Sequence, residues 1–398
     1  MRSVLITGDY VCNYAGMSSS RRIVGTESEM AERTIRRDSL ISCNTAFIDC
    51  RTPGSDLKEN YALIGSGVSQ NPDQFINLQI PHGYNVGGAA MPNGVTNSLH
   101  LHFTAEVFVI VEGEYTFRWG ADGQGGEFVG RAGDIVSVPT WIFRGFTNTG
   151  PDENIMFTVL GQDNTGGIIW GPSVLREAEG FGLYLTADNQ LVDTSDGRAL
   201  DPEIELVKPM PEKQIDELEV WTPERMRRRL VTVEDRMWSS RALMCTALEE
   251  GQVDLALIIG FGITEHRSQE PSIFNPHGFS LALLRAEPGK AMLQHRVTET
   301  QVVIVRKGRW EIRLNEREPV TVVLEENDTL SIPVGAWREF ANVGDETGEL
   351  YIVTGGDGRA RLEWDELILK GAQNEDVAYD ANGYLAPYSI VSTSTMDD

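Results

Sequence analysis

The 398-residue sequence predicts an all-β protein made of two tandem copies of one sandwich- or barrel-like domain. Short apolar runs alternate with polar residues and are interrupted by Gly, Asn and Pro, which is the pattern of antiparallel strands joined by turns. The segment 64–84 also aligns without a gap on the segment 259–279, at an offset of about 195 residues. A repeat of that length indicates a whole duplicated domain rather than a solenoid element.

The repeat continues toward the end of each copy. GQDNTGGIIW (161–170) matches GGDGRARLEW (355–364), and LYLTADNQLVD (183–193) matches VAYDANGYLAP (377–387). We therefore expect a first barrel over residues 41–200 and a second over residues 241–390. The strands expected in the first are EVFVIVEG, YTFRWG, DIVSVPT and NIMFTVLG, and those in the second are TQVVIVRKG, RWEIRL, TVVLEENDTLSIP and ELYIVTGG.

Three segments lie outside the two barrels. Residues 1–40 are polar and weakly patterned, which predicts an N-terminal arm or a poorly ordered lead-in. Residues 201–240 contain Pro202, Pro209 and Pro211 near their start, which predicts a linker, followed by a helix or by the opening strands of the second copy. Residues 391–398 form a tail whose last seven residues, STSTMDD, are expected to fray.

Composition restricts the class of partner. Acidic residues outnumber basic ones 59 to 34, for a net charge of −25, which argues against nucleic acid and anionic membrane surfaces. The N-terminus lacks a secretory pattern and no run of about 18 apolar residues occurs, so a cytoplasmic protein with a small-molecule partner is expected. A homo-oligomer stays open, because apolar outer faces such as Val107, Val109 and Val111 often pair. The four cysteines, at no metal-ligand or redox spacing, should be reduced and mostly buried.

The stretch GVTNSLHLHFTAEVFVIVEG carries a candidate metal site. His100, His102 and Glu106 are separated by even numbers, so one continuous strand would point all three to the same face. Phe108 and Ile110 share that face, which suggests the barrel interior. Two imidazoles and a carboxylate inside a barrel are costly unless they are paired or bind an ion. A 2-His-1-carboxylate set suits Fe(II), Mn(II) or Zn and leaves coordination positions open.

The same stretch resembles the first cupin motif, G-x5-H-x-H-x3-4-E-x6-G, at every defined position from Gly94 to Gly113. GDIVSVPTWIFRGFTN resembles the second, G-x5-P-x-G-x2-H-x3-N, at Gly133, Pro139 and Asn148. The resemblance implies a bicupin, with two tandem double-stranded β-helix (jelly-roll) barrels and short helices. Families of that architecture include quercetinase-like and gentisate-like dioxygenases, oxalate decarboxylases and seed storage proteins.

The second motif departs from the family pattern at two positions. Arg144 replaces the histidine that is normally the last metal ligand, and Trp141 replaces the second glycine. A guanidinium cannot bind a metal, and a cation ~5 Å from a divalent ion is repelled by several kcal/mol at an effective dielectric near 20. Arg144 is therefore compatible with a metal only if Glu106 or an anionic substrate lies between them. Trp141 and Phe108 are expected to contact the substrate, although core packing is the commoner fate of aromatic residues.

The second copy has lost most of its motif. His295 is retained, but Val297 stands at the second histidine and Gln301 at the glutamate, so we expect no metal in this barrel. Arg338 again occupies the last histidine position. An arginine in both copies serves either packing or a local carboxylate in each barrel, or an anionic ligand in each.

Three other histidines are weaker candidates. His82 and His277 lie in matching PHG-aromatic segments and are expected to be turn residues that hydrogen-bond the backbone. His82 remains an outside candidate for a replacement metal ligand, and His266 is expected at the surface.

The resemblance implies a metal-dependent enzyme, first of all an Fe(II)-type dioxygenase acting on a small acidic, enolic or aromatic substrate in the first barrel. His100, His102 and Glu106 would hold one divalent metal, with Fe(II) favoured over Mn(II), Zn or Ni, and Arg144 would orient the substrate. Glu106 could instead be a general base in isomerase, decarboxylase, cyclase or lyase chemistry without oxygen. A non-catalytic bicupin that binds a small molecule or serves as a storage protein is the remaining alternative.

Overall fold

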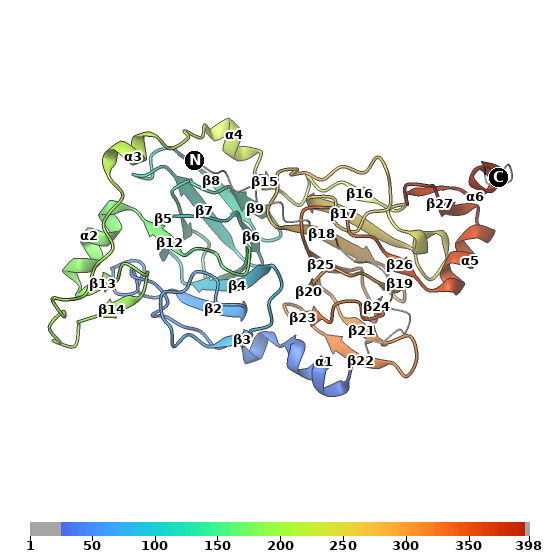
Figure 1. The fold of residues 1–398 in the computed structure, drawn as a ribbon, viewed down its shortest axis with the longest axis horizontal. Coiled ribbons are helices and arrows are strands. Elements are labelled where there is room, and N and C mark those ends of the chain that lie inside the picture. Colours follow the sequence, from blue (N-terminus) through green and yellow to red (C-terminus); the bar gives the residue numbers. More distant parts are fainter. Residues whose placement is uncertain (1–24, 395–398) are drawn as a thin grey trace, which may run out of the picture.

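Two barrels of similar construction lie side by side along the long axis of the molecule (Figure 1). The computed structural model describes residues 25–394. Each barrel consists of a five-stranded sheet facing a seven-stranded sheet, and nearly all strand pairs are antiparallel. The all-β duplicated fold expected from the alternating strand pattern is therefore confirmed.

The first barrel has the following strands. Its five-stranded sheet runs in the order β12 (Ile168–Trp170), β5 (Thr96–His102), β10 (Arg144–Asn148), β7 (Glu114–Trp119) and β8 (Gly126–Arg131). Its seven-stranded sheet runs in the order β15 (Leu230–Val231), β9 (Ile135–Val138), β6 (Glu106–Ile110), β11 (Asn154–Gly161), β4 (Tyr84–Met91), β2 (Glu59–Ile64) and β3 (Ile76–Leu78).

The second barrel repeats this order, except that a different, antiparallel strand takes the place of the parallel β3 at the edge of the seven-stranded sheet. Its five-stranded sheet contains β22 (Val320–Leu324), β21 (Trp310–Leu314), β24 (Arg338–Asn342), β19 (Ala291–Arg296) and β26 (Glu363–Trp364). Its seven-stranded sheet contains β1 (Thr34–Ile35), β23 (Thr329–Ile332), β20 (Gln301–Lys307), β25 (Gly348–Gly355), β18 (Phe279–Ala286), β17 (Val253–Ile259) and β16 (Trp238–Ser239).

Short helices and one small hairpin complete each copy. After its barrel, each copy has one helix and one hairpin: α2 (Pro172–Gly180) with β13 (Leu183–Leu185) and β14 (Leu191–Asp193), and α5 (Glu366–Asn374) with β27 (Val377–Tyr379) and β28 (Leu385–Pro387). The other helical segments are α1 (Glu27–Arg33), η1 (Arg37–Ser39), α3 (Glu212–Asp216), α4 (Pro223–Arg227), η2 (Met244–Ala247) and α6 (Tyr388–Ser394). Within residues 25–394, none of these helices is long and apolar enough to cross a bilayer.

The end of the chain differs from the expected frayed tail. Ser392, Thr393 and Ser394 belong to α6, because Ser389 N and Oγ donate to the Asp376 carboxylate and hold the start of that helix against the preceding turn. The last four residues of the expected tail lie outside the described residues.

The two barrels exchange their N-terminal arms. Strand β1 pairs with β23 of the second barrel, whereas β15, from the segment expected to be a linker, pairs with β9 of the first. The arms match each other at an offset of 196 residues: Thr26 and Thr222 both cap a short helix through their side-chain oxygen. Figure 1 shows α1 below the second barrel beside β22 and α4 above the first beside β8. Residues 25–35 form an arm, whereas residues 1–24 of the expected arm lie outside the described residues. The repeat extends further toward the N-terminus of each copy than the sequence indicated.

One histidine of each copy contacts a serine of the other barrel, at the point where the arm of its own copy docks. His82 Nε2 lies 2.7 Å from Ser331 Oγ on β23, and Arg33 donates to the same hydroxyl at 3.1 Å. In the mirror arrangement, His277 Nε2 lies 2.7 Å from Ser137 Oγ. The Nδ1 atoms of both rings contact backbone carbonyls two residues earlier, as expected of turn residues. His82 therefore lies at the interface between the barrels, and the idea that it replaces a metal ligand is wrong.

The facing seven-stranded sheets bury an apolar interface between the barrels. Val107 and Val109 are at most 1% exposed, in one cluster with Ile304 and Val353 of the second barrel. Val111, in the strand expected to offer an outer face to another copy, is a partly buried neighbour of the same cluster. The outer face of β6 is thus covered within the chain, because the duplicated domain supplies the opposing sheet.

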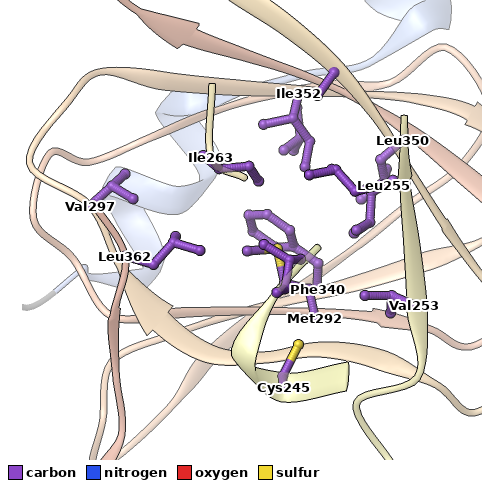
Figure 2. Close-up of a cluster of buried hydrophobic side chains, with 14 of the residues drawn as sticks. Cys245, Val253, Leu255, Ile263, Met292, Val297, Phe340, Leu350, Ile352 and Leu362 are labelled. Carbon is purple, nitrogen blue, oxygen red and sulfur yellow. The ribbon is translucent and has the colours of Figure 1, made fainter. Parts of the chain in front are cut away.

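The interior of the second barrel is filled with apolar side chains. Figure 2 shows Met292, Val297, Phe340 and Ile352 converging inside it, and all belong to one buried cluster. This close packing contrasts with the first barrel, where small and polar residues occupy several of the matching positions.

Candidate metal centre in the first barrel

The three candidate ligands come from both sheets of the first barrel. His100 and His102 lie on β5 in the five-stranded sheet, and Glu106 begins β6 in the seven-stranded sheet. The expectation of one continuous strand was wrong, because the chain leaves the strand at residues 103–105 and crosses between sheets. The side chains nevertheless converge, because the inner faces of the two sheets oppose each other.

One potential ligand atom from each residue lies within 4.8 Å of the others. His100 Nδ1 lies 2.6 Å from Ser98 O, which leaves Nε2 of that ring for the interior. His102 Nε2 lies 3.5 Å from Glu106 Oε2 and is buried without a hydrogen-bond partner among the described residues. An unsatisfied buried nitrogen is unfavourable. His295 Nε2 in the second barrel is also unpartnered, so it is the convergence of three donors in the first barrel that points to a missing ligand.

Arg144 holds the third candidate ligand. It lies on β10 opposite His100, is 1% exposed, and donates to Glu106 Oε2 from Nη2 at 2.7 Å and from Nε at 3.2 Å. In the second barrel, Arg338 Nη1 donates to Gln301 Oε1 at 3.1 Å. Of the two alternatives for the repeated arginine, the geometry therefore favours a local partner: each arginine binds the residue at the glutamate position of its own barrel.

Burial dominates the electrostatics of the site. Burial, followed by the charge of Arg144, holds the pKa of His100 well below its usual range, so this imidazole is neutral and able to bind a metal. Burial also raises the pKa of Glu106 to about 8. The hydrogen bonds from Arg144 act in the opposite direction, because they stabilise the carboxylate.

The residues present fit a metal with three protein ligands. Two imidazoles and a carboxyl group form the donor set, and their convergence within 4.8 Å, with His102 Nε2 unpartnered among the described residues, is the observation that supports the fit. Arg144 takes the fourth-ligand position, but its donors are directed at Glu106 Oε2 and at backbone carbonyls rather than at the histidine nitrogens. Glu106 Oε2 thus contacts both the guanidinium and His102. A glutamate between Arg144 and the metal was the condition for a metal site in the sequence analysis.

A pocket leads to these side chains. His100, His102, Glu106 and Phe108 line it, together with small or polar residues of the surrounding strands, among them Asn60, Gly87, Ala89, Asn97 and Thr158. Its cavity volume is about 70 Å³, which is room for a very small ligand and less than the ~300–1,000 Å³ of typical drug-sized sites. Phe108, one of the two aromatic residues expected to contact the substrate, is among the residues that line this pocket. None of the described residues that line it is Lys or Arg, and Arg144 is hidden behind Glu106.

Trp141 lies outside this pocket. Its φ of 62° is the left-handed conformation that the family glycine would adopt, and its side chain is 46% exposed, edge-on to Phe103. It lines a separate surface hollow with Ile142 and Trp221. The expectation that Trp141 contacts the substrate in the barrel is therefore not supported, because this backbone conformation turns the ring away from the interior.

Sequence reasoning missed the residues that create the pocket. Gly87, Ala89 and Thr158 correspond to Ala282, Leu284 and Ile352 in the second barrel, which are larger and help to fill it. Asn97 likewise corresponds to Met292. The signal was available in the repeat itself, as small or polar residues in one copy opposite larger apolar residues in the other.

Comparison with known proteins agrees with this geometry. Residues 89–160, which include all three candidate ligands, match the family model of the Cupin domain. The second barrel repeats the fold of the first, so the chain consists of two such barrels, the first of which contains the matched domain. By sequence, no protein of curated function matches it.

Solved structures with a similar fold are distant in sequence. A 7S globulin from Momordica charantia has 12% identity and a TM-score of 0.49, covering 84% of this chain and 86% of its own. An oxalate decarboxylase from Lactobacillus farciminis, in complex with formate, has 14% identity and a TM-score of 0.48, covering 81% and 86%. The oxalate decarboxylase from Bacillus subtilis has 12% identity and a TM-score of 0.47, covering 83% and 78%.

Proposed function

We propose that the first barrel, within residues 41–200, is a metal-dependent enzyme and that the second, within residues 241–390, is its structural partner. The observation that carries this proposal is the convergence of His100, His102 and Glu106 at the wall of a pocket, with one potential ligand atom of each within 4.8 Å of the others. Two features of the second barrel support this division of roles. Its interior is filled with apolar side chains, and only His295 remains of the three ligand positions, because Val297 and Gln301 occupy the other two.

We assign the reaction to the Fe(II)-type dioxygenases acting on a small enolic or aromatic substrate. The 2-His-1-carboxylate donor set suits Fe(II), which would supply redox chemistry toward dioxygen when bound. His100, His102 and Glu106 would hold the ion, Phe108 would contact an apolar part of the substrate, and the barrel wall would exclude water. Arg144 would act on Glu106 rather than on the substrate, because both of its short hydrogen bonds end on that carboxylate.

The second barrel supplies matched variants for the test. His102→Val and Glu106→Gln each introduce the residue that stands at the same position of the second barrel. Elemental analysis of protein purified without chelator should find about one metal ion per chain in the wild type and much less in both variants. Substrate screening should then be run with and without oxygen. Absence of metal in the wild type, not restored by adding Fe(II), Mn(II) or Zn(II), would defeat the proposal and leave a binding or storage protein.

A non-oxidative reaction is the second candidate. Its supporting observation is the pKa of Glu106, which burial raises to about 8, in the range useful for a general base. Glu106 would then take a proton from a substrate carbon or hydroxyl. Turnover that continues under strict exclusion of oxygen would favour this reaction class over the dioxygenase.

A further inference from the structure

A buried ion pair lies behind the pocket of the first barrel. Lys58 and Asp49 are at most 1% exposed, and Lys58 Nζ donates to Asp49 Oδ1 at 2.7 Å and Oδ2 at 2.6 Å. Its third hydrogen bond goes to Asn97 Oδ1 at 2.6 Å. All three donors of the ammonium group are therefore used, and the same buried cation holds both Asp49 and Asn97 in place.

The second barrel shows that the fold does not require this ion pair. Asp49, Lys58 and Asn97 correspond to Cys245, Val253 and Met292, which belong to the apolar cluster in Figure 2. Replacing a buried ion pair by apolar residues is often neutral or stabilising, because two charges no longer have to be desolvated. The ion pair is present in the barrel that has the pocket and absent from the described interior of the barrel that is filled. This difference indicates that the ion pair has a role in the pocket.

The ion pair fixes the orientation of Asn97. An ammonium group can only donate, so the carboxamide must turn Oδ1 toward Lys58 and offer Nδ2 elsewhere. Asn97 lines the pocket, three residues before His100 on the same strand. No side chain or carbonyl among residues 25–394 accepts a hydrogen bond from its Nδ2. The residue is thus a fixed donor without an acceptor at the wall of the pocket.

We infer that Asn97 is a substrate-binding residue, held in one orientation by the Lys58–Asp49 pair, and that it donates from Nδ2 to a neutral oxygen of the substrate. This inference rests on the proposed function of the same pocket. A carbonyl or hydroxyl oxygen is favoured over a carboxylate, because the pocket wall has no Lys or Arg to pair with an anion. Lys58 and Asp49 are positioning residues, since neither lines the pocket.

Acetamide, a small neutral molecule with a carbonyl oxygen as acceptor, is the probe. It is titrated into metal-free and Co(II)-loaded protein, followed by calorimetry and by the visible Co(II) spectrum. The variants are Asn97→Met and the double variant Asp49→Cys/Lys58→Val, which install the residues of the second barrel. We expect Asn97→Met to weaken the probe about five- to ten-fold, as for loss of one hydrogen bond, and the double variant to weaken it by a smaller factor. Co(II) affinity and the melting temperature should change little in either variant.

The outcomes separate the inference from the proposed function. If Co(II) does not bind but metal-free protein binds the probe in an Asn97-dependent way, the inference holds and the metal-dependent function fails. If Co(II) binds but wild type and Asn97→Met bind the probe equally, the inference is overturned and the metal site stands. Absence of probe binding in both forms also overturns the inference.

Discussion

At the residue scale, one carboxylate oxygen connects the candidate metal site to the barrel wall. Glu106 Oε2 accepts both short hydrogen bonds from Arg144 and also lies 3.5 Å from His102 Nε2. The arginine would be an unpaired buried cation without it. Glu106 therefore contributes to stability as well as to the proposed chemistry, and variants must separate the two roles.

Glu106→Ala and Glu106→Gln should differ in stability. Removing one partner of a buried ion pair typically costs about 3–5 kcal/mol, so Glu106→Ala should lower the free energy of unfolding by that order. Glu106→Gln should cost clearly less, because Gln301 and Arg338 already form the same buried pair in the second barrel. Chemical denaturation of both variants measures the difference. Equal losses would show that Arg144 does not depend on an acceptor at position 106.

Glu265 makes a prediction about pH. It is 2% exposed, accepts from Met244 N at 2.6 Å and Trp364 Nε1 at 2.9 Å, and burial raises its pKa to about 7. The folded state therefore holds this proton up to about pH 7, whereas the unfolded chain loses it near pH 4.5. Stability from this group is complete below pH 4.5 and is lost as pH rises to about 7.

Glu265→Gln should remove that pH dependence. Gln70 occupies the matching position of the first barrel, where its Oε1 accepts from Ile48 N and Trp170 Nε1. From pH 4.5 to 8 the unfolding free energy of the variant should improve relative to wild type by about 3 kcal/mol, from a shift of roughly two units or more at 1.36 kcal/mol each. Denaturation at both pH values tests it; a constant difference would mean that Glu265 does not titrate in this range.

At the element scale, the N-terminal arm is attached through the buried side chains of Met30 and Ile35 and through a few polar contacts. Asp328 accepts from Arg36 Nη1 at 2.6 Å and from Arg37 N at 2.9 Å, next to strand β23. Asp328→Ala should release the arm locally, and trypsin should then cleave after Arg36 and Arg37 roughly ten-fold faster, as for loss of about 1.5 kcal/mol of charged hydrogen bonding. Asp345→Ala, at an exposed position, is the control. Equal cleavage rates in the two variants would show that β-pairing and the burial of Met30 and Ile35 hold the arm without Asp328.

Strand patterning allowed the site to be predicted but not the way in which it is built. The apolar pattern identifies β7 and β21, in which buried and half-buried residues alternate, and also β6, β9, β11, β20 and β25, which are nearly continuous buried runs. It could not show that the chain turns at residues 103–105, since Phe103 and Ala105 continue an apolar pattern through the turn. It also missed β1 and β15, which are only two residues long and gain their order from a partner strand in the other barrel.

At the scale of the whole molecule, duplication explains both what the sequence predicted and what it could not. The repeat and the cupin motif predict two barrels and the ligands His100, His102 and Glu106. The positions of Trp141 and Lys58 could not be predicted, since one depends on a left-handed backbone conformation and the other on side chains distant in sequence. Periodicity specifies the face of a residue, but not its neighbours across a barrel.

The exchanged arms predict that the two halves of the chain depend on each other. Strand β15 belongs to the C-terminal half but completes a sheet of the first barrel, and β1 belongs to the N-terminal half but completes a sheet of the second. Each half alone would also expose the apolar interface around Val107 and Ile304. This is the organisation of an arm-exchanged dimer contained in one polypeptide.

Halves divided in the exposed turn after Gly197 should therefore be insoluble when expressed singly and should form a 1:1 complex when co-expressed. Size-exclusion chromatography with mass measurement gives the result. Val107→Asp in the N-terminal half should prevent assembly, because it buries a charge in the interface, whereas an exposed change such as Glu179→Ala should not. Two soluble, monomeric halves would show that each barrel folds without the arm of the other. The arm exchange would then join two independent domains rather than complete them.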